Sequence, residues 1–189
     1  VGLKVLIACE FSGIVREAFK AKGHDAWSCD LLPTEIPGQH IQGDVLEILN
    51  DGWDLMIAHD PCTYQSNSGV RWLVGNQERQ ELLKESCEFT KKILNAPINM
   101  IARENPIPHR YALNLIGRKY DQIIQPWMFG HGETKATCLW LKNLKKLTPT
   151  NIVDGRKGRV HREPPGPERW KNRSRTYQGV ADAFATQWG

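Results

Sequence analysis

The sequence has no apolar run long enough to span a bilayer, and its five cysteines show no Cys-x-x-Cys spacing. An odd number of cysteines argues against a disulfide framework, and no histidines or cysteines have the spacing of a zinc module, so we predict no metal site and a reducing cytoplasm. No basic leader precedes an apolar stretch, so no secretory signal is expected. Hydrophobic residues make up 40% of the 189 residues and charged residues 24%, which predicts one folded domain over 1–189 rather than disorder or two full enzyme domains.

Positive charge is concentrated in one segment. Residues 142–175 contain eleven lysines and arginines against three acidic residues, a net charge of +8, so the rest of this +4 chain carries −4. Clustered basic residues favour a polyanion such as DNA, and a solvated tail is the alternative. The candidate phosphate contacts in this segment are Arg156, Lys157, Arg159, Arg173 and Arg175, and Trp170 is the candidate for stacking on a base.

Strand-like and helix-like segments alternate along the chain. Apolar runs predict strands over residues 4–9, 25–29, 53–58, 98–102, 121–128 and 136–141, with a further short element opening at 42–45. Helical periodicity predicts helices over 14–22, 77–94 and 109–116. This alternation predicts an α/β fold with a mostly parallel sheet, helices on both faces, and ligands bound beyond the carboxyl ends of the strands.

Three polar features follow the first predicted strands. Phe11-Ser12-Gly13 forms a strand-to-helix turn, where a glycine lets the backbone approach a cofactor, although the full Gly-x-Gly-x-x-Gly pattern is missing. Asp30 ends the second strand, where a carboxylate can accept hydrogen bonds from ribose hydroxyls or cap a helix. Asp44 offers a carboxylate to the exocyclic amine of adenine. Together these residues predict an adenosine pocket.

Cys62 differs from the other cysteines in its surroundings. It lies in the polar turn 60–64 after a buried strand, where a thiolate can react, whereas Cys9, Cys29 and Cys138 lie in or beside apolar strands. Glu104 follows the next strand, and prolines stiffen the backbone after it. A thiol and a carboxyl group at neighbouring strand ends predict covalent catalysis. His59 could tune Cys62 or pack at the strand end.

The order of these motifs resembles that of the cytosine-5 DNA methyltransferases, and the chain looks like a compact, phage-type member; the motifs are Phe11-Ser12-Gly13, Asp30, Gly43-Asp44, Pro61-Cys62, Glu104-Asn105-Pro106 and Phe129-Gly130. The resemblance implies a class I Rossmann-like fold, S-adenosylmethionine as cofactor and duplex or single-stranded DNA as partner. It implies Cys62 as nucleophile and Glu104 as the acid that contacts the base, with Asn105 and Lys135 at the substrate. The implied cofactor contacts are Phe11, Ser12, Gly13, Asp30, Asp44, Asp60 and Pro61. Residues 177–181 resemble the family's last motif, whose helix returns to the cofactor pocket.

The sequence departs from this family at three places. Asp60 replaces the first proline of Pro-Pro-Cys, and a carboxylate beside the thiol disfavours thiolate. Where the family has Gln-x-Arg-x-Arg, this chain has Glu133, Lys135 and Thr137, so Lys135 alone could replace that basic clamp in part. The short basic segment 142–175 stands where the family inserts a target-recognition domain.

Two other functions stay open on these residues. Asp60-Pro61 also resembles the Asp-Pro-Pro-Tyr motif of amino-methyltransferases, which act on exocyclic amines of adenine or cytosine. The lost clamp and Asp60 leave a catalytically weak nucleic-acid-binding relative as the other alternative.

Overall fold

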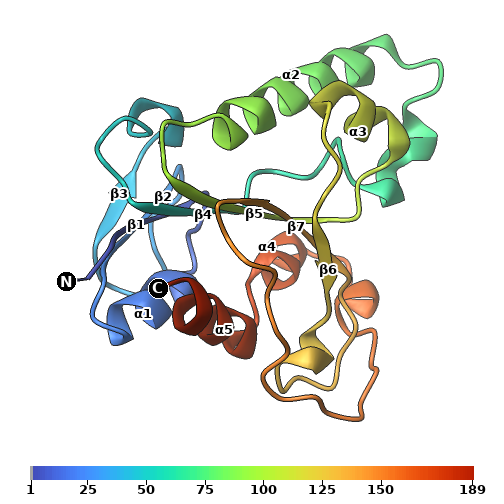
Figure 1. The fold of residues 1–189 in the computed structure, drawn as a ribbon. Helices are drawn as coiled ribbons and strands as arrows, with labels where there is room; N and C mark the ends of the chain where they lie inside the picture. Colours follow the sequence, from blue (N-terminus) through green and yellow to red (C-terminus); the bar gives the residue numbers. More distant parts are fainter. Residues whose placement is uncertain (1) are drawn as a thin grey trace.

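The computed structural model describes residues 2–189 and consists of a seven-stranded sheet with helices on both faces (Figure 1). The strands are β1 (Lys4–Ala8), β2 (Asp25–Asp30), β3 (His40–Gln42), β4 (Leu55–Ala58), β5 (Met100–Pro106), β6 (Gln122–Ile124) and β7 (Thr137–Lys142). The helices are α1 (Ile14–Ala21), α2 (Gln77–Leu94), α3 (Arg110–Ile116), α4 (Arg169–Ser174) and α5 (Gln178–Trp188), with short 3₁₀ turns η1 (Val45–Glu47), η2 (Asn67–Trp72), η3 (Pro126–Met128) and η4 (Val160–Arg162). Within residues 2–189, no helix combines the length and apolarity needed to cross a membrane.

The order of the strands across the sheet is β3-β2-β1-β4-β5-β7-β6. Strands β1 to β5 pair in parallel, whereas β7 runs antiparallel to both of its neighbours, β5 and β6. The chain moves outward in one direction from β1 to β3 and in the other from β4 onward, so the order reverses between β1 and β4. A crevice forms beyond the carboxyl ends of the strands at such a reversal, and ligands bind there. The predicted α/β fold with a mostly parallel sheet is confirmed.

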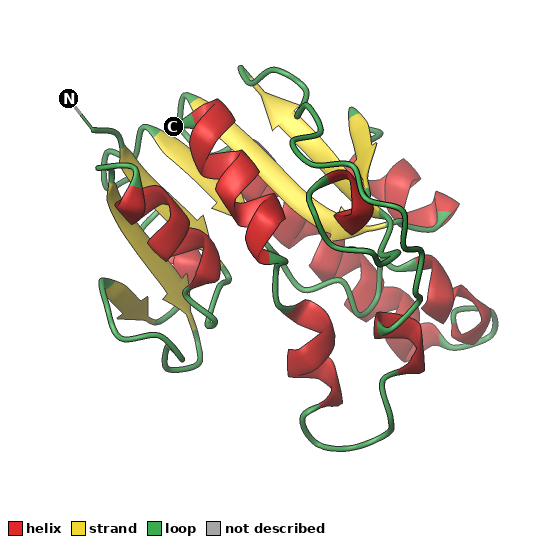
Figure 2. Cartoon of the chain, turned by 90° about the horizontal axis from the view of Figure 1, so that it is seen from below, coloured by secondary structure: helices red, strands yellow, loops and turns green. Residues whose placement is uncertain are grey.

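Both faces of the sheet are covered because its strands are apolar on both sides. Val5 and Ile7 of β1 belong to one buried cluster, whereas Leu6 and Ala8 belong to another, as the two-residue period of a strand requires. Figure 2 shows α1 and α5 side by side on one face, and Figure 1 shows α2 and α3 on the other. The last helix therefore packs beside the first one, where the chain leaves β1.

The structure differs from the sequence prediction at several element boundaries. β5 continues through Pro106 because it pairs with β7 from Ile101 to Pro106, so Glu104 lies within a strand rather than after one. The predicted strand 121–128 is only three residues long, since Pro126 has no backbone N–H for a strand ladder and begins a 3₁₀ turn. The short element expected at 42–45 is the end of β3 followed by η1, and α4 was not predicted.

Candidate functional site

A cavity of about 570 Å³ lies at the carboxyl ends of β1, β4 and β5. The segment before β7 and the chain between η4 and α5 complete its lining. The structure brings these predicted site residues together in the lining: Phe11, Ser12, Asp60, Cys62, Glu104, Asn105, Lys135, Arg173 and Arg175. The other predicted site residues lie outside it: Gly13, Asp30, Asp44, Pro61, Arg156, Lys157 and Arg159.

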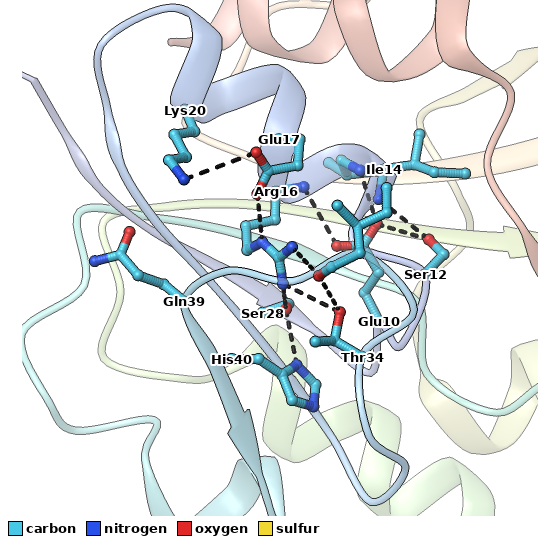
Figure 3. Close-up of polar contacts among 12 residues, drawn as sticks. Glu10, Ser12, Ile14, Arg16, Glu17, Lys20, Ser28, Thr34, Gln39 and His40 are labelled. Atoms are coloured by element: carbon cyan, nitrogen blue, oxygen red, sulfur yellow. Dashed lines mark hydrogen bonds and ion pairs between the residues drawn. The ribbon is translucent and has the colours of Figure 1, made fainter.

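The turn after β1 is shaped by Glu10, a buried residue that the sequence analysis missed (Figure 3). Its carboxylate accepts hydrogen bonds from the backbone N–H of Val15 at 2.7 Å and of Arg16 at 3.3 Å, and from the Ser12 hydroxyl at 3.1 Å. A carboxylate in this place accepts hydrogen bonds from N–H groups that have no partner within α1. Its negative charge is also stabilised by the positive end of the helix dipole. Gly13 follows with a φ of 80°, a conformation that favours glycine.

Arg16 holds the loop after β2 against α1 (Figure 3). Its guanidinium is fully buried and donates to the Ser28 hydroxyl at 3.0 Å, the Thr34 hydroxyl at 3.2 Å and the Ile36 carbonyl at 2.6 Å. Helical periodicity alone places Arg16 on α1 but does not reveal these partners, which come from other elements. The loop that begins at Asp30 is thereby fixed beside the turn after β1.

Asp30 and Asp44 border this region without reaching the cavity. Asp30 accepts the backbone N–H of Leu32 at 2.9 Å, and Asp44 caps η1 through the N–H of Leu46 at 2.9 Å. Burial raises the pKa of the cavity-lining Cys9 thiol, and the charges of Asp60, Asp30 and Asp44 raise it further. Their role toward adenosine stays a prediction.

Cys62, Glu104 and His59 all line the cavity, and His59 and Glu104 are in direct contact. His59 Nδ1 lies 2.6 Å from Glu104 Oε2, and the two side chains are 11% and 12% exposed. Burial would raise the pKa of Glu104, but the hydrogen bond with His59 and the charge of that residue lower it below the usual value. Burial raises the pKa of the Cys62 thiol, and the charge of Glu104 adds to this effect, whereas Lys135 opposes it. Lys135 lowers the pKa of Glu104 as well.

Asp60 forms a buried ion pair with Arg103, a residue of β5 that the sequence analysis did not single out. Arg103 Nε lies 2.6 Å from Asp60 Oδ1 and Nη2 lies 3.0 Å from Oδ2, while the Thr90 hydroxyl donates to Oδ2 at 2.7 Å. Both side chains are almost completely buried. Since both carboxylate oxygens are engaged inside the protein, the Asp60 carboxylate is directed at Arg103 rather than at a bound cofactor.

The same network anchors the turn that carries Cys62. Gln65 accepts from Arg103 Nη2 at 2.8 Å and donates to Thr90 on α2 at 2.9 Å. The guanidinium of Arg103 also lies over the ring of the buried Trp140, 4.3 Å from its centroid. The predicted substrate contact Asn105 donates its side-chain amide to the Asp60 carbonyl at 2.9 Å and is 3% exposed. Arg103 directly follows the apolar run 98–102, and a charged residue joined to a buried strand was the available signal.

The basic segment contributes six residues to the cavity lining, namely Val160, His161, Trp170, Arg173, Ser174 and Arg175. Trp170 lies against Phe11, with ring centroids 5.6 Å apart, so its ring covers one of the predicted cofactor contacts. Arg175 pairs with Glu35 at 2.6 Å, which ties this part of the segment to the loop after β2. Arg173 also lines the cavity, and its buried Nε has no hydrogen-bond partner within residues 2–189.

The other basic residues lie elsewhere. The guanidinium of Arg156 stacks on Trp127 at 3.9 Å and donates to backbone carbonyls, while Arg159 pairs with Glu133 at 3.0 Å. Lys142 pairs in register with Ile101, toward the start of β5 and away from the cavity. The basic segment is therefore divided in space, and its parts in η4 and around α4 border the site. Within residues 2–189, no three His, Cys, Asp or Glu side chains are placed to hold a metal ion.

Comparison with known proteins supports this architecture. No protein-family model and no curated protein matches the chain. Among solved structures, it is similar to an E. coli protein provisionally named as a DNA modification methyltransferase encoded within a prophage, with 16% identity and a TM-score of 0.51. The alignment covers 80% of this chain and 52% of the other, so this chain spans about half the length of that protein. At this identity the likeness concerns the fold, which is a Rossmann-like class I methyltransferase fold.

Proposed function

We propose that this protein is an S-adenosylmethionine-dependent DNA methyltransferase that acts on carbon 5 of cytosine. The observation that carries the proposal is the common position of Cys62 and Glu104. They come from adjacent parallel strand ends and line one cavity at the place where this fold binds its ligands. The fold likeness to a protein named as a DNA modification methyltransferase supports the same class of reaction.

The residues present fit the cofactor. A cavity of about 570 Å³ is within the range of small-molecule sites, and Phe11 and Ser12 form part of its wall next to the glycine turn. Asp30 ends β2 and Asp44 precedes η1, both outside the lining, and we propose them as the partners of the ribose and the adenine. When bound, S-adenosylmethionine supplies the methyl group.

The two central residues have complementary roles toward the base. The Cys62 thiolate adds to carbon 6, and the electron pair displaced toward ring nitrogen 3 takes a proton from Glu104, which makes carbon 5 nucleophilic enough to accept the methyl group. Loss of the carbon 5 proton and elimination of Cys62 then restore the ring. A cytosine in duplex DNA would have to be flipped out of the stack to reach the cavity. Lys135 assists Cys62 because its charge favours thiolate.

The position of Asp60 disfavours the amino-methyltransferase alternative. That reaction needs an acidic or polar side chain facing the exocyclic amine, but both oxygens of the Asp60 carboxylate bind Arg103 in the interior. A weak nucleic-acid-binding relative would retain DNA binding without forming methylated product.

DNA containing 5-fluorocytosine tests the proposal. Fluorine cannot leave as a cation, so the enzyme should remain covalently attached after methyl transfer, and the adduct should require S-adenosylmethionine. It should disappear in Cys62→Ala and persist in Cys9→Ala, a matched control because Cys9 lines the same cavity. Nucleoside mass spectrometry with ordinary DNA identifies the product. An amino-methylated base, or an adduct that survives Cys62→Ala, would overturn the proposal, and so would DNA binding without any product.

A further inference from the structure

His59 is placed by the sheet to act on Glu104. Its backbone N–H donates to the Ala8 carbonyl at 2.9 Å, which continues the pairing of β4 with β1 by one residue. Its side chain approaches Glu104 at 2.6 Å, and its buried Nε2 has no hydrogen-bond partner within residues 2–189. His59 and Glu104 both line the cavity. A histidine that only packed at the strand end would not need a carboxyl partner at this distance.

The charges around His59 come from three elements. Glu104 lies on β5, Glu10 follows β1, and Lys135 precedes β7. Burial would lower the pKa of His59, and Lys135 also lowers it, but the hydrogen bond and charge of Glu104, helped by Glu10, raise it above the usual value of a histidine. The opposite shift of Glu104 has the same cause, since each partner stabilises the charged form of the other. The contact therefore favours an imidazolium next to a carboxylate.

We propose that His59 is the proton store of Glu104, a positioning residue that supplies the acid with the proton it delivers to the base. This inference rests on the proposed function, because it concerns the protonation of ring nitrogen 3. In the resting pair, the transferable proton is on His59 Nδ1. As Cys62 adds to carbon 6, the proton passes from Nδ1 to Glu104 and from Glu104 to ring nitrogen 3, which leaves a neutral imidazole and a carboxylate. When Cys62 is eliminated, ring nitrogen 3 returns the proton along the same path, so the pair is restored.

The pH dependence of turnover in His59→Asn tests this role. An asparagine amide can still donate a hydrogen bond to Glu104, but it cannot store a proton. We expect kcat to fall roughly a hundredfold at pH 8 and less at pH 6, which is the lower end of the range for a general acid, with KM nearly unchanged. The alkaline limb of the profile should move to lower pH, because Glu104 must then hold the proton without help.

His109→Asn is the matched control. His109 is also buried, but it caps α3 by accepting the Ala112 N–H at 3.1 Å, and asparagine is a good helix cap. This variant should keep the pH profile of the wild type. An equal loss of kcat at every pH in His59→Asn, with the alkaline limb unmoved, would overturn the proposal.

The pair can also be tested without turnover or DNA. In the histidine NMR titration of the full chain, His59 should titrate above the usual pKa of about 6.5. In Glu104→Gln it should titrate at a lower pH, because burial remains and the carboxylate is gone. Identical titration in both proteins overturns the inference even if His59→Asn fails to fold. A wild type that shows this shift but never methylates DNA contradicts the proposed function instead, and leaves the His59–Glu104 proton pair in place.

Discussion

The Asp60–Arg103 pair gives the sharpest prediction about stability. In Asp60→Asn the side chain keeps its size, but Arg103 is left as a buried charge without its counterion. Removing one partner of a buried, hydrogen-bonded pair costs about 3–5 kcal/mol of the free energy of unfolding. The stacking of Arg103 on Trp140 remains, but it does not replace the lost carboxylate. We therefore expect Asp60→Asn to be strongly destabilised.

The expected loss is large compared with the stability of a protein domain, which is about 5–15 kcal/mol. For a chain of this length, 1 kcal/mol shifts the Tm by roughly 2–4 °C, so the Tm should fall by roughly 6–20 °C. Thermal melting followed by circular dichroism measures this shift, and urea unfolding gives the free energy directly. A loss below about 1 kcal/mol would refute the reasoning, because surface pairs contribute that little.

The double variant Asp60→Pro/Arg103→Met separates the ion pair from the packing around it. Removing both charges avoids the buried unpaired cation, so this variant should be more stable than Asp60→Asn. Recovery should be incomplete, since Gln65 and Thr90 lose their partners. The sequence predicts that Asp60 disfavours the Cys62 thiolate, and in the structure the charge of Asp60 does raise the pKa of that thiol, so Asp60→Pro would raise activity if the fold were unaffected. The structure predicts instead that this single variant loses stability, so activity should be compared in the double variant.

Two further predictions concern ligands. S-adenosylmethionine at a hundred times its Kd should stabilise the fold by about 2.7 kcal/mol, and Asp30→Ala should abolish most of this gain, whereas the exposed control Asp182→Ala should keep it. An unchanged melting curve of the wild type at saturating cofactor would contradict the adenosine pocket. If Arg173 contacts a phosphate, Arg173→Met should weaken DNA binding and reduce the slope of log K against log salt concentration by about one. Arg156→Met should change both quantities less, because the Arg156 guanidinium stacks on Trp127. Equal effects of both substitutions would show that Arg173 has no special position.

The sequence predicts what depends on short-range patterns. Continuous apolar runs such as 4–9 and 53–58 predict buried strands, and the structure confirms them as β1 and β4, with slightly shorter bounds, because both faces of the sheet are covered. The ends of these strands then indicate where polar side chains gather, so Cys62 and Glu104 could be expected at one edge of the sheet. Both residues line the cavity found there.

The missed features depend on partners that are distant in sequence. Arg103 and Asp60 are 43 residues apart, and the local sequence around either residue does not indicate that the two form an ion pair. Glu104 lies inside a strand because β7, more than thirty positions further along the chain, pairs with it. Glu10 is closer to its partners, but its role depends on the sharp turn at Gly13, which brings the carboxylate back over the start of α1.

The proposed reaction requires a deprotonated Cys62 and a protonated Glu104 in the same cavity, and these two states need opposite electrostatic surroundings. His59 matters because it can reconcile them. A thiolate at Cys62 is favoured by positive charge, whereas a protonated Glu104 is favoured by negative charge and burial. Lys135 lowers the pKa of both residues, so it favours the thiolate of Cys62 but disfavours the protonated form of Glu104. A proton held on a neighbouring imidazole resolves the conflict, because Glu104 can stay ionised at rest and still receive a proton when the base needs it. In the proposed mechanism, the 2.6 Å contact between His59 and Glu104 thus lets one cavity hold both a nucleophile and an acid.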